Sequence, residues 1–158
     1  MENTDNQLKY ENYKEQFKRL KSAMTNGFNL EAMFIEYAII EDRTESILRH
    51  GGKWEAYLKK RGRHEVTLKS KVDYIQAQAT SNRKDLLNHC FSDDLLSQIL
   101  AWKEDRNRLI HALLKQRLEH NEVRNLAEKG KSLAEELRKR SGSYNRAVDR
   151  QRTKESQL

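Results

Sequence analysis

Residues 30–49, which read LEAMFIEYAIIEDRTESILR, form the most apolar segment of the chain. Their apolar side chains recur at spacings of three and four, which predicts an α-helix with a broad buried face. Asn29 is a suitable N-cap for this helix, and Gly51 and Gly52 are suitable residues to end it. Because no other segment is as apolar, we expect this helix at the centre of the fold.

The same periodicity predicts further helices on both sides of the central one. They are expected at about residues 5–24, 66–78, 92–117 and 122–140, with a weaker, short helix around residues 54–58. The chain has 158 residues with no proline and only 6 glycines, which favours long helices. The sequence therefore predicts an all-α protein, an up-and-down bundle of four to five helices.

The domain organisation is expected to be simple. We predict a single helical domain over residues 1–143, because the length suits one core. After Ser141-Gly142-Ser143 apolar residues become rare, so residues 144–158 are predicted to be a frayed or disordered basic tail.

The formal net charge is +7, and it is unevenly distributed. Residues 115–158 contain 12 lysines and arginines against 7 aspartates and glutamates. Such an excess attracts phosphate backbones and acidic partners. A solvated helix face is the simpler interpretation of a charge run taken alone.

The cellular setting is predicted from what the chain carries. Cys90 is the only cysteine and has no partner for an internal disulfide, which fits a reducing compartment. The first ten residues are polar and lack the pattern of a secretory signal. No apolar run approaches the roughly 20 residues that span a bilayer. We expect a cytoplasmic protein that does not enter a membrane.

The predicted helix over residues 92–117 contains the sequence Arg106-Asn107-Arg108-Leu109-Ile110-His111. Asn107 and His111 are four residues apart and share a helix face, whereas Arg106 lies about 140° from His111 around the axis. Histidine can accept or donate a proton near neutral pH. Arginine can hold a phosphate by two hydrogen bonds, and asparagine can orient an imidazole or a ribose hydroxyl.

The pattern Arg-Asn-x-x-x-His, late in a small helical domain, resembles the signature of HEPN-domain ribonucleases. The resemblance covers about residues 30–116. An acidic residue on an upstream apolar helix is a second family feature, for which Glu36, Glu41 and Asp42 are available. Glu36 is the first choice because it is embedded among apolar residues, where a charge needs a reason. Leu113 departs from the many toxin-type members that carry tyrosine there, so silencing by modification of that tyrosine is not implied.

The resemblance implies an HEPN-like bundle that forms a homodimer through the motif-bearing helices, with one composite site between them. It implies a metal-independent endoribonuclease that needs no cofactor, in which the ribose 2′-hydroxyl attacks the neighbouring phosphate. His111 would be the acid or base, Arg106 the clamp for transition-state charge, Asn107 the orienting group and Glu36 the supporting acid. Toxin or phage-defence function, with an antitoxin or regulatory protein as partner, is also implied.

Basic residues elsewhere are candidates for contacts to RNA phosphates. A short cluster in an expected exposed loop and one arginine inside the motif are the choices: Lys59, Lys60, Arg61, Arg63 and Arg108. A solvated loop explains the cluster equally well. The sequence shows no metal-ligand spacing, since His89-Cys90 stands without the further ligands that zinc requires.

Two other functions fit the same residues. A non-catalytic helical module would bind RNA or a protein through its basic C-terminal helix. A structural helical protein would only oligomerise. Cleavage of a mixed RNA pool with EDTA present separates the nuclease from the module, and salt-dependent affinity for nucleic acid separates the module from the structural protein.

Overall fold

The computed structural model describes residues 2–158, with side-chain environments from residue 6 onward. Residues 2–158 form seven α-helices and no strand, which confirms the prediction of an all-α protein. The helices are α1 (Glu2–Thr25), α2 (Asn29–His50), α3 (Trp54–Arg61), α4 (Leu68–Ser81), α5 (Leu86–Phe91), α6 (Leu95–Ala112) and α7 (His120–Glu155). The count exceeds the expected four to five because α3 and α5 have only 8 and 6 residues.

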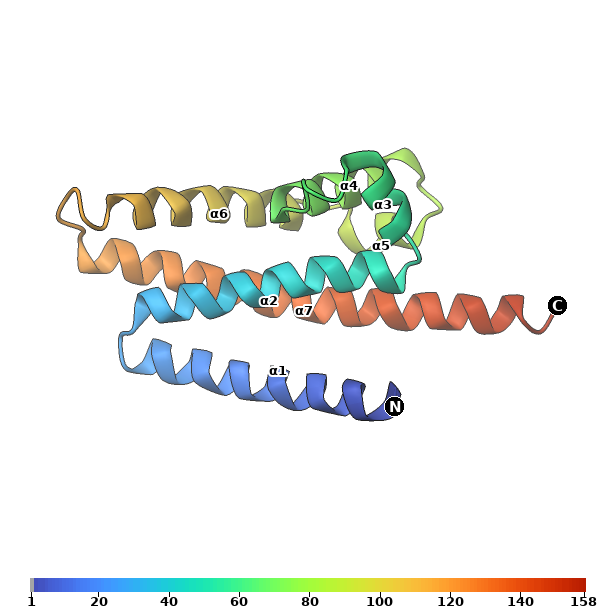
Figure 1. The fold of residues 1–158 in the computed structure, drawn as a ribbon, viewed down its shortest axis with the longest axis horizontal. Helices are drawn as coiled ribbons and strands as arrows, with labels where there is room; N and C mark the ends of the chain where they lie inside the picture. Colours follow the sequence, from blue (N-terminus) through green and yellow to red (C-terminus); the bar gives the residue numbers. More distant parts are fainter. Residues whose placement is uncertain (1) are drawn as a thin grey trace.

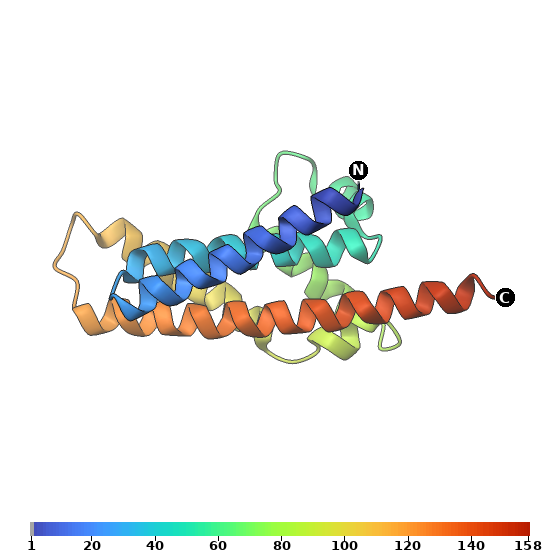
Figure 2. The same ribbon diagram turned by 90° about the horizontal axis from the view of Figure 1, so that it is seen from below.

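The long helices run up and down along one axis (Figure 1). α2 and α7 make the most extensive contact in the fold and form its centre. α1 packs beside α2, α6 packs on α7, and α3–α5 gather where α2 ends and α6 begins (Figure 1). The view from below shows α1 diverging from α7 towards the N-terminus (Figure 2).

The core explains why α2 is central, as the sequence predicted. α2 buries ten of its residues, among them Ile40, Ile47 and Leu48, which are fully inaccessible to solvent. Burying each such side chain stabilises the fold by about 1.5–3 kcal/mol. α1 ends at Thr25, two residues before Gly27, whose φ of 74° lies in the left-handed region that glycine adopts without strain.

The expected end of the last helix near Arg140 and the frayed tail after it are wrong. α7 is 36 residues long and continues to Glu155. Tyr144 and Val148 are buried, and the Tyr144 ring packs edge-on against Phe91 of α5 with centroids 6.2 Å apart. Ser-Gly-Ser is a local signal for a break, and here packing against distant helices outweighs it.

The middle of the chain also differs from expectation. α3 extends through Arg61, so most of the expected basic loop at residues 59–63 is helical. α5 was not predicted, because six residues are too few to display a helical period. Its start is set by Asp85, whose side chain accepts a hydrogen bond of 2.9 Å from the Leu87 amide. α6 begins at Leu95 after Asp94, not at Ser92, and ends at Ala112.

At Gly130, α7 lies in close contact with side chains of both α2 and α6. A Cβ atom at this position would overlap the Glu36 carboxylate and the Trp102 ring. The Trp102 indole also donates a hydrogen bond of 3.0 Å to the Leu126 carbonyl, which ties α6 to α7. The absence of a side chain at Gly130 therefore fixes the distance between these helices.

Gly130→Ala is expected to lower the free energy of unfolding by about 1–3 kcal/mol, because the added methyl group overfills this junction. Gly142→Ala is the matched control in the same helix, where the nearest atom is the end of the Arg146 side chain at 3.4 Å. It should raise the free energy of unfolding by roughly 0.5–1 kcal/mol, the usual helix preference for alanine. Urea unfolding followed by circular dichroism measures both, and shifts of the same sign would contradict the close approach at Gly130.

Candidate functional site

Glu36 lies at the junction of α2, α6 and α7 and is 0% exposed. Neither carboxylate oxygen has a hydrogen-bond partner in the described part of the chain. Burial raises the pKa of Glu36 to about 8, against the opposing effect of the positive charges of Lys131 and Arg106. The carboxyl is therefore mostly protonated at neutral pH.

Arg106 reaches from α6 towards α2. Its guanidinium lies over the Tyr37 ring, 4.6 Å from the centroid, and Nη1 donates a hydrogen bond of 3.3 Å to Asn107 Oδ1. Its Nε is buried and has no partner among the described residues. Burial lowers the pKa of Arg106, and Tyr37 and Glu36 act in the opposite direction. An arginine nevertheless stays charged, so a cation is held against the core beside a neutral acid.

The structure places Arg106 in contact with Asn107 and with Tyr37, the neighbour of Glu36 in α2, and leaves His111 apart. Asn107 is half-buried beside Arg106, whereas His111, one turn further along α6, is exposed. Arg108 is also exposed and pairs with Asp105 at 3.4 Å. It lies about 160° from Arg106 around the helix axis, so it belongs to another face of α6.

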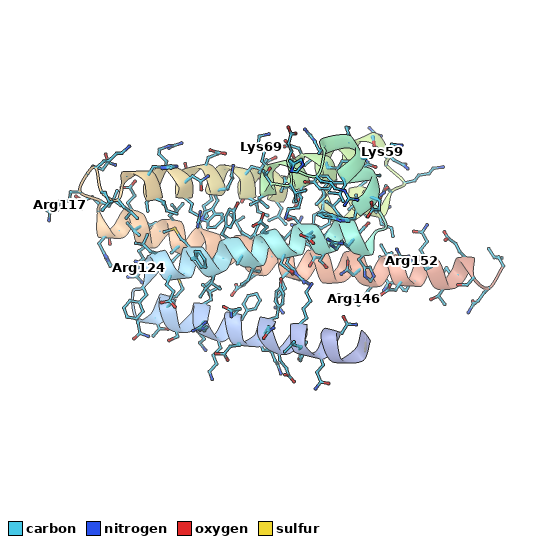
Figure 3. All side chains as sticks on the ribbon, viewed as in Figure 1. Lys59, Lys69, Arg117, Arg124, Arg146 and Arg152 are labelled. Atoms are coloured by element: carbon cyan, nitrogen blue, oxygen red, sulfur yellow. The ribbon has the colours of Figure 1, made fainter. Side chains whose placement is uncertain are left out.

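The predicted basic cluster at residues 59–63 lies at the end of the molecule opposite to the end of α6, where His111 is found. Figure 3 shows Lys59 near the end formed by α3–α5, and Arg117, just beyond α6, at the opposite end. Lys59, Lys60 and Arg63 are exposed, while Arg61 is half-buried. Within one protomer this cluster is not placed beside His111. The basic side chains labelled in Figure 3 are spread over the whole length of the bundle.

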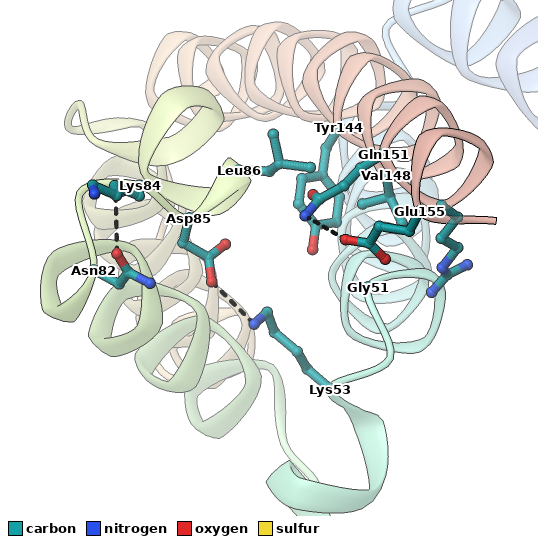
Figure 4. Close-up of a pocket in the computed structure, with 11 residues that line it drawn as sticks. Gly51, Lys53, Asn82, Lys84, Asp85, Leu86, Tyr144, Val148, Gln151 and Glu155 are labelled. Atoms are coloured by element: carbon teal, nitrogen blue, oxygen red, sulfur yellow. Dashed lines mark hydrogen bonds and ion pairs between the residues drawn. The ribbon is translucent and has the colours of Figure 1, made fainter. Parts of the chain in front are cut away.

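A polar pocket of about 350 Å³ lies between α7 and the segments that follow α2 and α4 (Figure 4). Lys53 pairs with Asp85 at 3.1 Å, and Gln151 donates a hydrogen bond of 3.2 Å to Glu155 (Figure 4). These groups satisfy one another, and no motif residue lines the pocket. It is therefore separate from the candidate site.

Exposed apolar side chains lie on α2 and at the end of α6, the two helices that carry Glu36 and Arg106. We call this surface the motif face and define it by two residues of α2 and three in or just after α6: Leu30, Phe34, Ile110, Leu113 and Leu114. Phe34 is 70% exposed and Leu114 is 100% exposed. Leu30 and Leu113 line one shallow depression, so the two parts of the face are neighbours. Contiguous apolar side chains on a surface commonly mark a protein contact.

Sequence reasoning alone does not find all the groups at this site. Tyr37 follows Glu36 directly, and only its contact with Arg106 gives it a role. Lys131 acts on Glu36 because α7 packs on α2, and no local pattern connects residues so far apart. The described residues contain no group of three or more His, Cys, Asp or Glu arranged to hold a metal ion.

Comparisons with known proteins give no relative from which the function of this site could be transferred. No family model, no curated protein and no solved structure matches the chain. Among residues 2–158, no helix combines the length and the apolar character needed to cross a membrane.

The raised pKa of Glu36 predicts a specific dependence of stability on pH. Between about pH 4.5 and 8 the unfolded chain releases this proton while the folded chain retains it, so stability falls as pH rises. Relative to Glu36→Gln, the free energy of unfolding of the wild type should decrease by up to about 1.4 kcal/mol per pH unit in this window.

Urea unfolding of both proteins at several pH values measures this difference. The paired comparison cancels all other titrating groups, since the two chains differ at one position only. Parallel pH profiles for wild type and Glu36→Gln would show that Glu36 titrates normally and is not held neutral by burial.

Proposed function

We propose that the chain is an endoribonuclease of the HEPN type that acts as a homodimer. The observation that carries the proposal is the packing of the Arg106 guanidinium on Tyr37 of α2, the residue next to the buried Glu36, with Asn107 beside Arg106. The sequence pattern assigns these residues to one site together with His111. A cation held beside a protonated acid keeps its charge available for a substrate phosphate.

A second protomer supplies what one protomer lacks. His111 is open to solvent, and no pocket described above includes it. A two-fold contact through the motif face would bury Ile110 and Leu114 and bring two copies of His111 and Arg106 to one cleft. Two imidazoles allow one to act as base while the other acts as acid.

The reaction follows from these groups. One His111 takes the proton of the ribose 2′-hydroxyl, whose oxygen forms a bond to the adjacent phosphorus. The bond from phosphorus to the 5′-oxygen breaks, and the second His111 gives that oxygen a proton. Arg106 stabilises the negative charge of the transition state. The products are a 2′,3′-cyclic phosphate end and a 5′-hydroxyl end, and no metal takes part in these steps.

His111→Ala is expected to reduce RNA cleavage by about 100-fold or more, the usual contribution of a general acid or base. Because His111 is exposed, fold and dimer should be unchanged. The assay is cleavage of a labelled RNA pool with EDTA present, with analysis of the new ends for cyclic phosphate. His64→Ala, at an exposed histidine of the loop between α3 and α4, is the matched control.

Two outcomes would contradict the assignment. Wild-type cleavage by His111→Ala would exclude a role for this imidazole. Salt-dependent RNA binding by the wild type without any cleavage would favour a non-catalytic RNA-binding module instead.

Leu114→Glu is expected to raise the dimer dissociation constant by about tenfold or more and to lower cleavage in parallel, because it places a charge in the proposed interface. Leu8→Glu is the matched control, since Leu8 is 57% exposed on α1 and lies outside the motif face. Sedimentation velocity over a range of concentrations measures the dimer. Equal dissociation constants for Leu114→Glu and Leu8→Glu would show that the dimer contact does not involve the motif face.

A toxin or phage-defence role, restrained by an antitoxin or other regulatory protein, completes the proposal. What supports it is the family resemblance of the motif. Arrest of growth on expression of the wild type, but not of His111→Ala, would support it directly.

A further inference from the structure

A long groove lies between α1 and the middle of α7, with one contribution from α2. Its volume is about 1150 Å³, the largest of the pockets described here. Figure 1 shows α1 on the side of α2 away from α6, and Figure 2 shows it diverging from α7. The groove shares no lining residue with the motif face or with the site around Arg106.

The groove is strongly basic. Six cationic side chains line it: Lys9, Lys14, Arg43, Arg138, Lys139 and Arg146. Its two acids are paired with cations outside the lining, Glu135 with Lys131 at 3.2 Å and Glu136 with Arg140 at 2.7 Å. A groove in which charges of one sign predominate concentrates the opposite charge along its length.

The six cations differ in how far they are neutralised. Lys9 and Arg43 share Asp42, at 3.3 and 2.6 Å. The other four have no carboxylate partner within 4.0 Å among the described side chains. These are the cations that can bind an anionic ligand without losing an existing ion pair.

Aromatic rings alternate with these cations. Tyr10, Tyr13 and Phe17 follow one another along a face of α1. The Lys14 ammonium lies 4.9 Å from the Tyr10 centroid, and the Arg138 guanidinium lies 5.0 Å from the Phe17 centroid. Tyr10 is 60% exposed, so its ring remains the most accessible of the three.

This combination identifies the chemistry of the ligand. Cations along a groove pair with successive phosphates, while rings and guanidinium planes stack on unpaired bases. An acidic peptide would use the cations and leave the rings unused. A duplex would offer phosphates but keep its bases stacked on one another.

We propose that the groove between α1 and α7 binds single-stranded nucleic acid, with phosphates on Lys14, Lys139 and Arg146 and a base on Tyr10. The inference goes beyond the proposed nuclease function and does not depend on it, because none of the proposed catalytic residues lines the groove. Binding therefore persists in a protein that does not cut.

The test measures binding of a labelled oligouridine whose 2′-hydroxyls are methylated, so that 2′-hydroxyl attack cannot destroy it. The groove variant combines Lys14→Gln, Lys139→Gln and Arg146→Gln. The control combines Lys18→Gln, Lys21→Gln and Arg150→Gln, exposed residues that do not line the groove. Both variants lose the same charge, so a general effect of net charge would affect them equally.

Fluorescence anisotropy at several salt concentrations should distinguish the variants. The groove variant is expected to bind at least about tenfold more weakly, and its slope of log affinity against log salt should be smaller by about 2, from three lost phosphate contacts. The control should bind within about twofold of the wild type. Equal losses in the two variants would overturn the proposal.

Tyr10 separates a nucleic-acid groove from a general anion surface. Tyr10→Ala should weaken binding by about tenfold without changing the salt slope, and Tyr10→Phe should restore it, because stacking needs only the ring. Equal binding of oligothymidine would show that the groove accepts either sugar, which supports the proposal. Displacement by polyglutamate at equal charge, or equal affinity for a duplex, would overturn it.

Discussion

The close contact of α7 with α2 and α6 at Gly130, where one carboxyl is buried, is the constraint on which the candidate site depends. Glu36 and Trp102 both pack against Gly130, and α7 can lie this close to α2 and α6 only because Gly130 has no side chain. Trp102 is fully buried and hydrogen-bonded to the backbone of α7, so the register of α6 is fixed there. Arg106 follows one turn later, and the core rather than a surface loop therefore determines where its guanidinium lies.

The junction at Gly130 places polar groups in the core at a cost in stability. Buried polar atoms without partners, such as both oxygens of Glu36 and Nε of Arg106, cost about 1–3 kcal/mol each. An apolar residue at position 36 would avoid part of that cost. Strongly perturbed acids beside a cation are found at functional sites more often than in purely structural cores. The balance of energies therefore favours a role for the pair beyond packing.

Local periodicity was sufficient for the parts of the fold that depend on nearby residues. It predicted α2 at the centre, the end of α1 just before Gly27 and the helix that carries Arg106 and His111. It failed where contacts between residues far apart in sequence determine the structure. α7 is an example, because it continues past Ser141, where Tyr144 packs on Phe91. The same limit applies to the site. Spacing places Asn107 on the same helix face as His111, but only the packing of α7 on α2 brings Lys131 to Glu36.

The two proposed surfaces have a geometric relation that gives them a joint consequence. The motif face involves α2 and α6, and the basic groove lies on the far side of α2, between α1 and α7 (Figure 1). A two-fold contact through the motif face would therefore leave both grooves of a dimer open to solvent. In such a dimer a strand held in one groove would be tethered to the protein that carries the proposed cleft, and its effective concentration there would exceed that of free RNA. The groove would thus favour long single strands over short fragments even if the cleft itself were indifferent to length.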